Sequence, residues 1–143
     1  MIPSGYDKVY IVTDYYDGAR AGVADFNGQP HYYECQFDES KNDWSDIFLL
    51  TPLDSESFRL ALEDWDIWER WNAAREGGTV SEDTYPALPE DRERHDETAE
   101  ILKSRLKTDP EKDMKAKAEF EVIEPKRKGK SIATLIVKWS VIS

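Results

Sequence analysis

The sequence predicts an α+β fold: an antiparallel β-meander extended by a C-terminal β-hairpin, with a Trp-rich amphipathic helix packed on the sheet and a second, solvated helix. Three patterns predict this class. Strand-like alternation fills the start of the chain, a helical period follows from residue 55, and alternation returns after residue 115. With 143 residues, of which 39% are hydrophobic, the chain has the size and the apolar content of a single domain, 1–143.

The first strands are predicted from two turn signals. Asp17-Gly18 and Asn27-Gly28 are dipeptides that favour type I′ hairpin turns. They separate three segments rich in β-forming residues, 8–16, 19–26 and 31–38. If both loops have two residues, position 14 lies opposite 21, and 21 lies opposite 34. A fourth strand at 46–50 would extend the strand region over about residues 8–50.

This register sorts the side chains of the three strands into two faces. One face is the expected main core: Val9, Ile11, Thr13, Tyr15, Arg20, Gly22, Ala24, Phe26, His31, Tyr33, Cys35 and Phe37. The other face mixes phenols and carboxylates around small residues: Tyr10, Val12, Asp14, Tyr16, Ala19, Ala21, Val23, Asp25, Tyr32, Glu34 and Gln36. We therefore expect Tyr10, Tyr16 and Tyr32 to contribute to a binding surface.

A helix is predicted at residues 55–76. Asp54 is the expected N-cap, and Gly77-Gly78 ends the helix. Its apolar residues fall on two nearly opposite sides, with Phe58, Ala61, Leu62, Trp65 and Trp68 on one and Leu60, Ile67 and Trp71 on the other. Such a helix needs two partners. One is the sheet, and the other is the later helix, the C-terminal strands or a second subunit.

The second half of the chain is predicted from its breakers and charges. A linker at 79–88 precedes a helix at 89–107, and a β-hairpin at 116–142 follows. Apolar residues are few in this second helix, so we expect it to be largely solvated. His95 stands one helical turn from Asp91, but the alternating charges around them are typical of an exposed, salt-bridged helix rather than of a metal site.

Charge is divided unevenly between the two parts of the chain. Residues 1–102 hold 8 basic and 24 acidic side chains, and residues 103–143 hold 11 basic and 6 acidic ones, within a formal net charge of −11. The acidic balance argues against a protein that coats nucleic acid. The opposite signs predict that the basic segment docks on its own domain or pairs two molecules. The loop residues Lys126, Arg127 and Lys128 are candidates for contact with an anionic partner.

Cys35 is the only cysteine, and no segment has the cationic start of a leader or the apolar length of a membrane helix. We therefore expect a cytoplasmic protein that makes no membrane contact. The sequence lacks a zinc knuckle, a dinucleotide fingerprint and a phosphate-binding loop, so no cofactor and no metal site are predicted.

The strongest candidate for chemistry is a group of polar residues on the first strands. Asp14 and Glu34 flank Ala21 in the counted register, where two carboxylates would raise each other's pKa or share a cation. Asp17 and His31 are further candidate catalytic residues, although His31 projects to the opposite face.

The leading functional prediction is a small acidic protein-binding or regulatory protein without catalysis, with a protein partner or self-association and with Trp71 at an interface or groove. One alternative is a hydrolase or metal-dependent enzyme that uses the carboxylate cluster. Another is an acidic nucleic-acid mimic or inhibitor protein. The residues identify neither a specific activity nor a small-molecule ligand.

Overall fold

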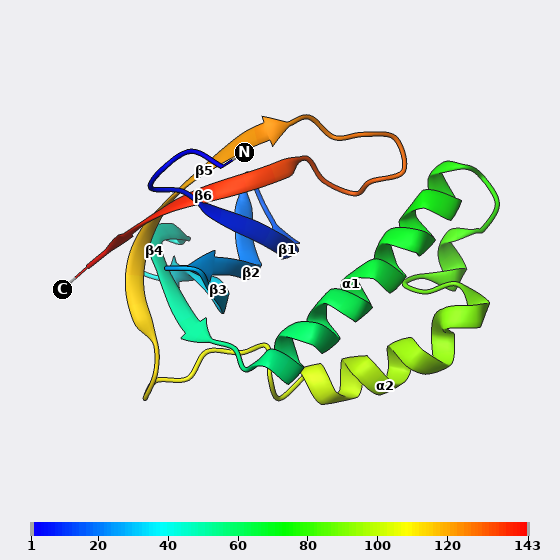
Figure 1. Cartoon of the computed structure of the whole chain (residues 1–143), viewed down its shortest axis with the longest axis horizontal. Helices are drawn as coiled ribbons and strands as arrows, with labels where there is room; N and C mark the ends of the chain where they lie inside the picture. The colour runs from blue at the N-terminus through cyan, green and yellow to red at the C-terminus, as the bar shows by residue number, and fades with distance from the viewer. Residues whose placement is uncertain (1, 143) are drawn as a thin grey trace.

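Six antiparallel strands close into a β-barrel in the computed structural model, which describes residues 2–142. The strands are β1 (Asp7–Tyr15), β2 (Ala19–Phe26), β3 (Gln29–Asp38), β4 (Asp43–Pro52), β5 (Met114–Glu124) and β6 (Thr134–Val141). They follow one another around the barrel in chain order (Figure 1). The barrel closes where β6 pairs with β1, through Asp7 opposite Val137 and Lys8 opposite Ile136.

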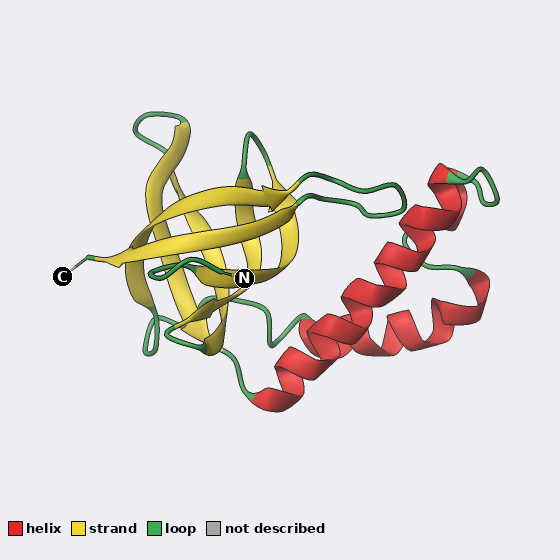
Figure 2. Cartoon of the chain, turned by 45° about the horizontal axis from the view of Figure 1, so that its top comes forward, coloured by secondary structure: helices red, strands yellow, loops and turns green. Residues whose placement is uncertain are grey.

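The helices lie together outside the barrel, in the connection from β4 to β5 (Figure 2). They are α1 (Ser55–Glu76), the 3₁₀ turns η1 (Glu82–Thr84) and η2 (Pro89–Asp91), and α2 (Arg92–Leu102). Asp54 caps α1, since its Oδ1 accepts a hydrogen bond of 2.7 Å from the backbone N–H of Ser57. Within residues 2–142, no helix combines the length and the apolar character needed to cross a membrane.

The α+β class is confirmed, but the sheet is closed rather than an open meander with an added hairpin. The C-terminal hairpin does extend the first four strands, because β5 pairs with β4. Its other strand, β6, reaches back to β1 and removes both sheet edges. Counting along the first strands cannot reveal this closure, because it depends on a pairing between the two ends of the chain.

The second helix is shorter and less solvated than expected. Regular helix ends at Leu102 instead of residue 107, and Thr98 and Leu102 are buried. Both residues face α1, where the side chain of Thr98 bonds Asp64 and Leu102 packs in a cluster with Leu60. The later helix, one of the three partners considered for the second side of α1, thus packs against that helix.

The predicted register is confirmed at its centre, where Ala21 lies opposite both Asp14 and Glu34. Elsewhere β1 is irregular, with register shifts on both sides of the Ile11–Val12 segment. Each such bulge moves the following side chains to the other face of a strand. As a result Val12 and Ala19 point into the barrel, whereas Ile11 packs outside against α1, and the assignment of these three residues to faces was wrong. Tyr15 and Phe37 were also expected in the main core, but both are exposed.

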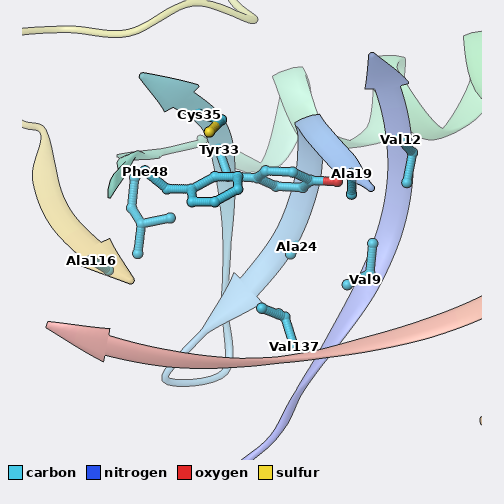
Figure 3. Packing of buried hydrophobic residues seen from close by; sticks show 10 residues of the cluster. Val9, Val12, Ala19, Ala24, Tyr33, Cys35, Phe48, Ala116 and Val137 are labelled. Atoms are coloured by element: carbon cyan, nitrogen blue, oxygen red, sulfur yellow. The ribbon is translucent and has the colours of Figure 1, made fainter. Parts of the chain in front are cut away.

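The barrel interior is filled by an aromatic cluster. Tyr33, Phe48, Phe120 and Trp139 have ring centroids 5.7–6.0 Å apart. Tyr33 is completely buried among residues from several strands (Figure 3), and its hydroxyl donates to the carbonyl oxygen of Ile11 at 3.2 Å. Strands β1 and β2 can come this close only because residue 22 is glycine, since a Cβ atom there would lie 1.9 Å from the carbonyl oxygen of Ile11.

Candidate functional site

A cleft of about 370 Å³ lies between β1 and the two helices. Four aromatic side chains contribute to its lining: Tyr15, Trp65, Trp68 and Tyr85. The remaining wall is mostly aliphatic, and its polar side chains are Thr13, Asp64 and His95. An apolar cleft of this size with a few polar groups has the composition of a small-molecule binding site.

Different elements supply the four aromatic rings of the cleft. Trp65 and Trp68 are three residues apart on α1 and so share one side of the helix, with ring centroids 5.1 Å apart. Tyr15 ends β1 and is 64% exposed, and Tyr85 follows η1 and is 59% exposed. The ring of Tyr85 is held edge-on against Trp71, with centroids 5.0 Å apart. The two tyrosines therefore place exposed rings beside the half-buried tryptophans.

The polar part of the wall is a hydrogen-bonded group that joins α1 to α2. Nδ1 of His95 lies 2.7 Å from Oδ1 of Asp64, and the hydroxyl of Thr98 donates to the same oxygen at 2.8 Å. In the part of the chain that the structure describes, neither Nε2 of His95 nor Oδ2 of Asp64 has a hydrogen-bond partner. Asp91, which stands one turn before His95, instead accepts two hydrogen bonds from Arg70.

The connection between β5 and β6 reaches α1 beside this cleft (Figure 1). Glu76 accepts hydrogen bonds from Nζ of Lys126 at 2.8 Å and from the backbone N–H of Gly129 at 2.9 Å. Both hydrogen bonds lower the pKa of the Glu76 carboxyl, and the bond from Lys126 has the larger effect. Ser131 in the same connection bonds Glu69. This basic segment thus docks on its own domain, which is one of the two outcomes expected from the uneven charge.

The other two basic candidates in this connection have different surroundings. Arg127 pairs with Glu124 three residues earlier, and Lys128 is exposed. Of the three residues proposed for an anionic partner, Lys126 is thus engaged with α1 and Arg127 with its own hairpin.

The carboxylate candidates on the first strands are only partly brought together. Asp14 and Glu34 lie on either side of Ala21, and Asp14 is exposed whereas Glu34 is half-buried. Both carboxylates lie near Tyr32, whose hydroxyl donates to Glu34 at 2.9 Å. Asp17 sits in the exposed turn with a φ of 54°. None of these carboxylates lines the cleft.

His31 lies apart from the carboxylates, as its predicted face requires. Its ring packs edge-on against Phe26 with centroids 5.4 Å apart, and its Nδ1 is 2.8 Å from the carbonyl oxygen of Gln29. Over residues 2–142, no three His, Cys, Asp or Glu side chains are grouped so that they could hold a metal ion.

The aromatic binding candidates differ in exposure. Tyr10 packs edge-on against Phe58 of α1 and donates to Asp25 at 2.9 Å, so that burial and this bond raise the pKa of its phenol to about 12. Tyr32 is buried, and this burial, with the bond to Glu34, raises the pKa of its phenol. Tyr16 is 67% exposed and presents its ring to solvent.

Trp71 is largely covered, but it borders a small pocket that Arg75, Glu82 and Tyr85 also line, and its place at an interface stays a prediction. Its side chain is 4% exposed, and its Nε1 donates to the hydroxyl of Thr84 at 2.8 Å. The segment between α1 and α2 folds back over the ring, a contact that helical periodicity does not indicate. Trp65 and Trp68 line the cleft, and Trp65 also packs against the cluster that contains Ile11 and Leu60.

Together the fold and the cleft define an antiparallel β-barrel with a two-helix insertion that encloses an aromatic site. No protein-family model, curated protein or solved structure matches the chain. The interpretation of the site therefore rests on its geometry. In the sequence, the signal for this cleft was the pair of tryptophans three residues apart. The position of Tyr85 and the Asp64–His95 contact gave no such signal, because they depend on how α2 folds back on α1.

Proposed function

We propose that this chain is a small binding protein without catalysis of its own, and that its ligand is a small organic molecule held in the cleft between β1 and α1. The observation that carries this proposal is the lining of the 370 Å³ cleft, where four aromatic rings surround few polar side chains. Such a surface desolvates a ligand of modest size, and the polar groups orient it.

The surroundings of the polar residues favour binding over catalysis. The pair of His95 and Asp64 resembles the base and the orienting acid of a hydrolase, but such a reaction also needs a nucleophile within hydrogen-bond reach of the base. Among the described residues, neither a serine nor a cysteine lines the cleft, and its hydroxyl groups, those of Thr13, Tyr15 and Tyr85, form no hydrogen bond with His95. Cys35 is 3% exposed inside the barrel, where burial raises the pKa of its thiol.

A protein partner is a second candidate, favoured by the exposed rings of Tyr15 and Tyr16 between Asp14 and Asp17. Exposed aromatic side chains are frequent anchors of interfaces. Light scattering after size-exclusion chromatography, at low and high salt, tests self-association. A strict monomer under both conditions argues against it.

A cytoplasmic location also stays a proposal, based on the single cysteine. The described residues add no support for the metal-dependent enzyme or the nucleic-acid mimic.

The test of the cleft uses the neutral fluorescent probe N-phenyl-1-naphthylamine. Thr13 is exposed on β1 and lines the cleft, so the variant Thr13→Trp fills the site without truncating the core. The matched control is Ser140→Trp, an exposed position on β6 outside the lining. We expect saturable fluorescence enhancement with the unmodified chain and with the control, and a loss of at least about tenfold in affinity with Thr13→Trp. Equal binding by both variants would place the probe elsewhere and overturn the proposal.

A further inference from the structure

We propose that the ligand of the cleft is an organic cation, in particular a molecule with a quaternary ammonium group. This inference rests on the proposed function and deepens it, because it assigns a chemical class to the occupant. Three properties of the site carry it: the number of aromatic rings, the sign of the nearby charge and the free oxygen of a lining carboxylate.

The aromatic rings supply the first argument. A cation over the face of Trp, Tyr or Phe is attracted by the quadrupole of the ring, and Trp gives the strongest attraction. The cleft combines two tryptophans of α1 with Tyr15 and Tyr85. Quaternary ammonium groups suit such a lining, because they carry charge but offer no N–H group that would remain unpaired against aromatic carbon.

The charge around the cleft supplies the second argument. Within residues 2–142 the lining holds one carboxylate, Asp64, and neither Lys nor Arg. Of the cations that stand next to lining residues, Arg94, Lys103 and Arg105 are paired with Glu63, Glu100 and Asp54, and Lys107 is exposed. Asp14 and Asp66 also stand next to lining residues and are exposed. Low-dielectric walls focus the field of such charges into a cleft, which attracts cations to it.

The neighbouring guanidinium groups are engaged elsewhere. Arg94 forms an ion pair with Glu63, and Nη2 of Arg92 donates to the carbonyl oxygen of Thr84 at 2.6 Å. An anionic ligand would therefore find no Lys or Arg in the lining, and the imidazole of His95, the one basic group there, is already paired with Asp64 through Nδ1.

Asp64 supplies the third argument. Its Oδ1 accepts hydrogen bonds from α2, while no bond from residues 2–142 reaches its Oδ2. The carboxylate is thus fixed in place, with one oxygen left to face a positive charge. A neutral apolar ligand would displace water from Oδ2 without offering a new hydrogen bond or charge to this oxygen, and such desolvation costs free energy. A cation would offset that cost.

The test compares choline with 3,3-dimethylbutan-1-ol, its neutral isostere, by NMR titration of the full chain. The two molecules have nearly the same shape and differ in charge. We expect choline to bind about tenfold more tightly, as a cation–π site predicts. Equal affinities would overturn the inference.

Two variants locate the source of the preference. Asp64→Asn keeps an oxygen that can accept from His95 and Thr98 but removes the charge, so we expect it to lower the affinity for choline and to leave that for the alcohol nearly unchanged. Trp68→Phe should retain more choline affinity than Trp68→Leu, because it keeps an aromatic ring. Trp44→Phe, outside the cleft lining, is the control. Circular dichroism melting establishes that each variant is folded. Unchanged choline binding by folded Asp64→Asn would contradict the assignment of the carboxylate.

The failures of the two proposals are distinguishable. If Thr13→Trp abolishes binding of the neutral naphthylamine probe but choline shows no preference, the binding function stands and the cationic ligand class is wrong. If neither the naphthylamine nor choline binds in a way that depends on Thr13, the proposed function itself fails.

Discussion

The interior of the barrel and its interface with the helices are built on different principles. Inside the barrel, Tyr33 is completely buried in a cluster of four aromatic rings. Outside it, Ile11 and Val23 pack against Leu60 and Ala61 of α1, yet the neighbouring surface leaves a cleft of about 370 Å³. A closed sheet surrounds its own core from all sides, whereas a helix contacts a curved outer surface along only part of its length. The difference shows where this fold has room for a ligand.

The largest effect is expected from Tyr33→Ala, which tests whether the barrel interior carries the stability. Removal of a fully buried aromatic side chain typically costs about 3–5 kcal/mol in the free energy of unfolding. We expect a correspondingly large fall in the urea midpoint, measured by circular dichroism. The control Tyr33→Phe removes only the bond to the carbonyl oxygen of Ile11, for an expected cost of about 1 kcal/mol. Similar midpoints for the two variants would show that the ring is not a main source of stability.

A smaller effect is expected from a matched pair of tryptophan truncations, one in each region. Trp139 and Trp65 are both half-buried, but Trp139 contacts three rings and donates from Nε1 to the carbonyl oxygen of Asp25 at 3.0 Å. Trp65 borders the cleft, so it has fewer partner atoms on that side. We expect Trp139→Ala to cost roughly 2 kcal/mol more than Trp65→Ala, measured by urea unfolding. Equal costs would mean that the cleft lining is packed as tightly as the barrel.

The smallest effect concerns the start of α1 and appears as a pH dependence. The pKa of the Asp54 carboxyl lies below its usual 3.8, mainly because the carboxylate accepts a hydrogen bond from the backbone N–H of Ser57. Because the folded pKa is depressed, the cap stabilises the helix above the pKa of the unfolded state, and this contribution is lost as the pH falls through the folded pKa. Asp54→Asn can still cap but does not titrate. We expect its melting temperature to lie on the order of 2 °C below that of the unmodified chain at pH 7, and the gap to close at low pH. A gap that does not change with pH would rule out a titrating cap.

Local signals in the sequence predicted several elements of the fold well. α1 has the expected bounds because both of its ends are encoded nearby, by the side chain of Asp54 and by Gly77-Gly78. Asn27-Gly28 gives the expected two-residue turn, since both residues adopt positive φ. The Asp17-Gly18 turn takes in Tyr16 as well, because β1 ends one residue earlier than the counted register assumes. The faces of Ile11 and Val12 were exchanged for another reason, the register shift between Val12 and Asp14, which no local signal in the sequence marks.

The candidate site was less accessible to sequence reasoning. The carboxylates on the first strands were identified from their register, and Asp14 and Glu34 do flank Ala21. The cleft, however, lies on the neighbouring part of the outer surface, and its lining comes from β1, α1, the segment before α2, α2 itself and the β5–β6 connection. A single periodic pattern describes one element at a time, so it cannot show that Tyr15 and Tyr85 lie at the same cleft.

The sequence by itself determined the α+β class, the position of α1 and the central register of the first strands, because capping residues, turn dipeptides and side-chain period act over a few neighbours. Only the tertiary structure decided that β6 closes the barrel on β1, that Trp71 is covered, and that Trp65 and Trp68 border an open cleft. These features depend on contacts between residues far apart in the chain. The uneven charge illustrates both levels, since its division is visible in the sequence, but its docking through Lys126 and Glu76 is visible only in the fold.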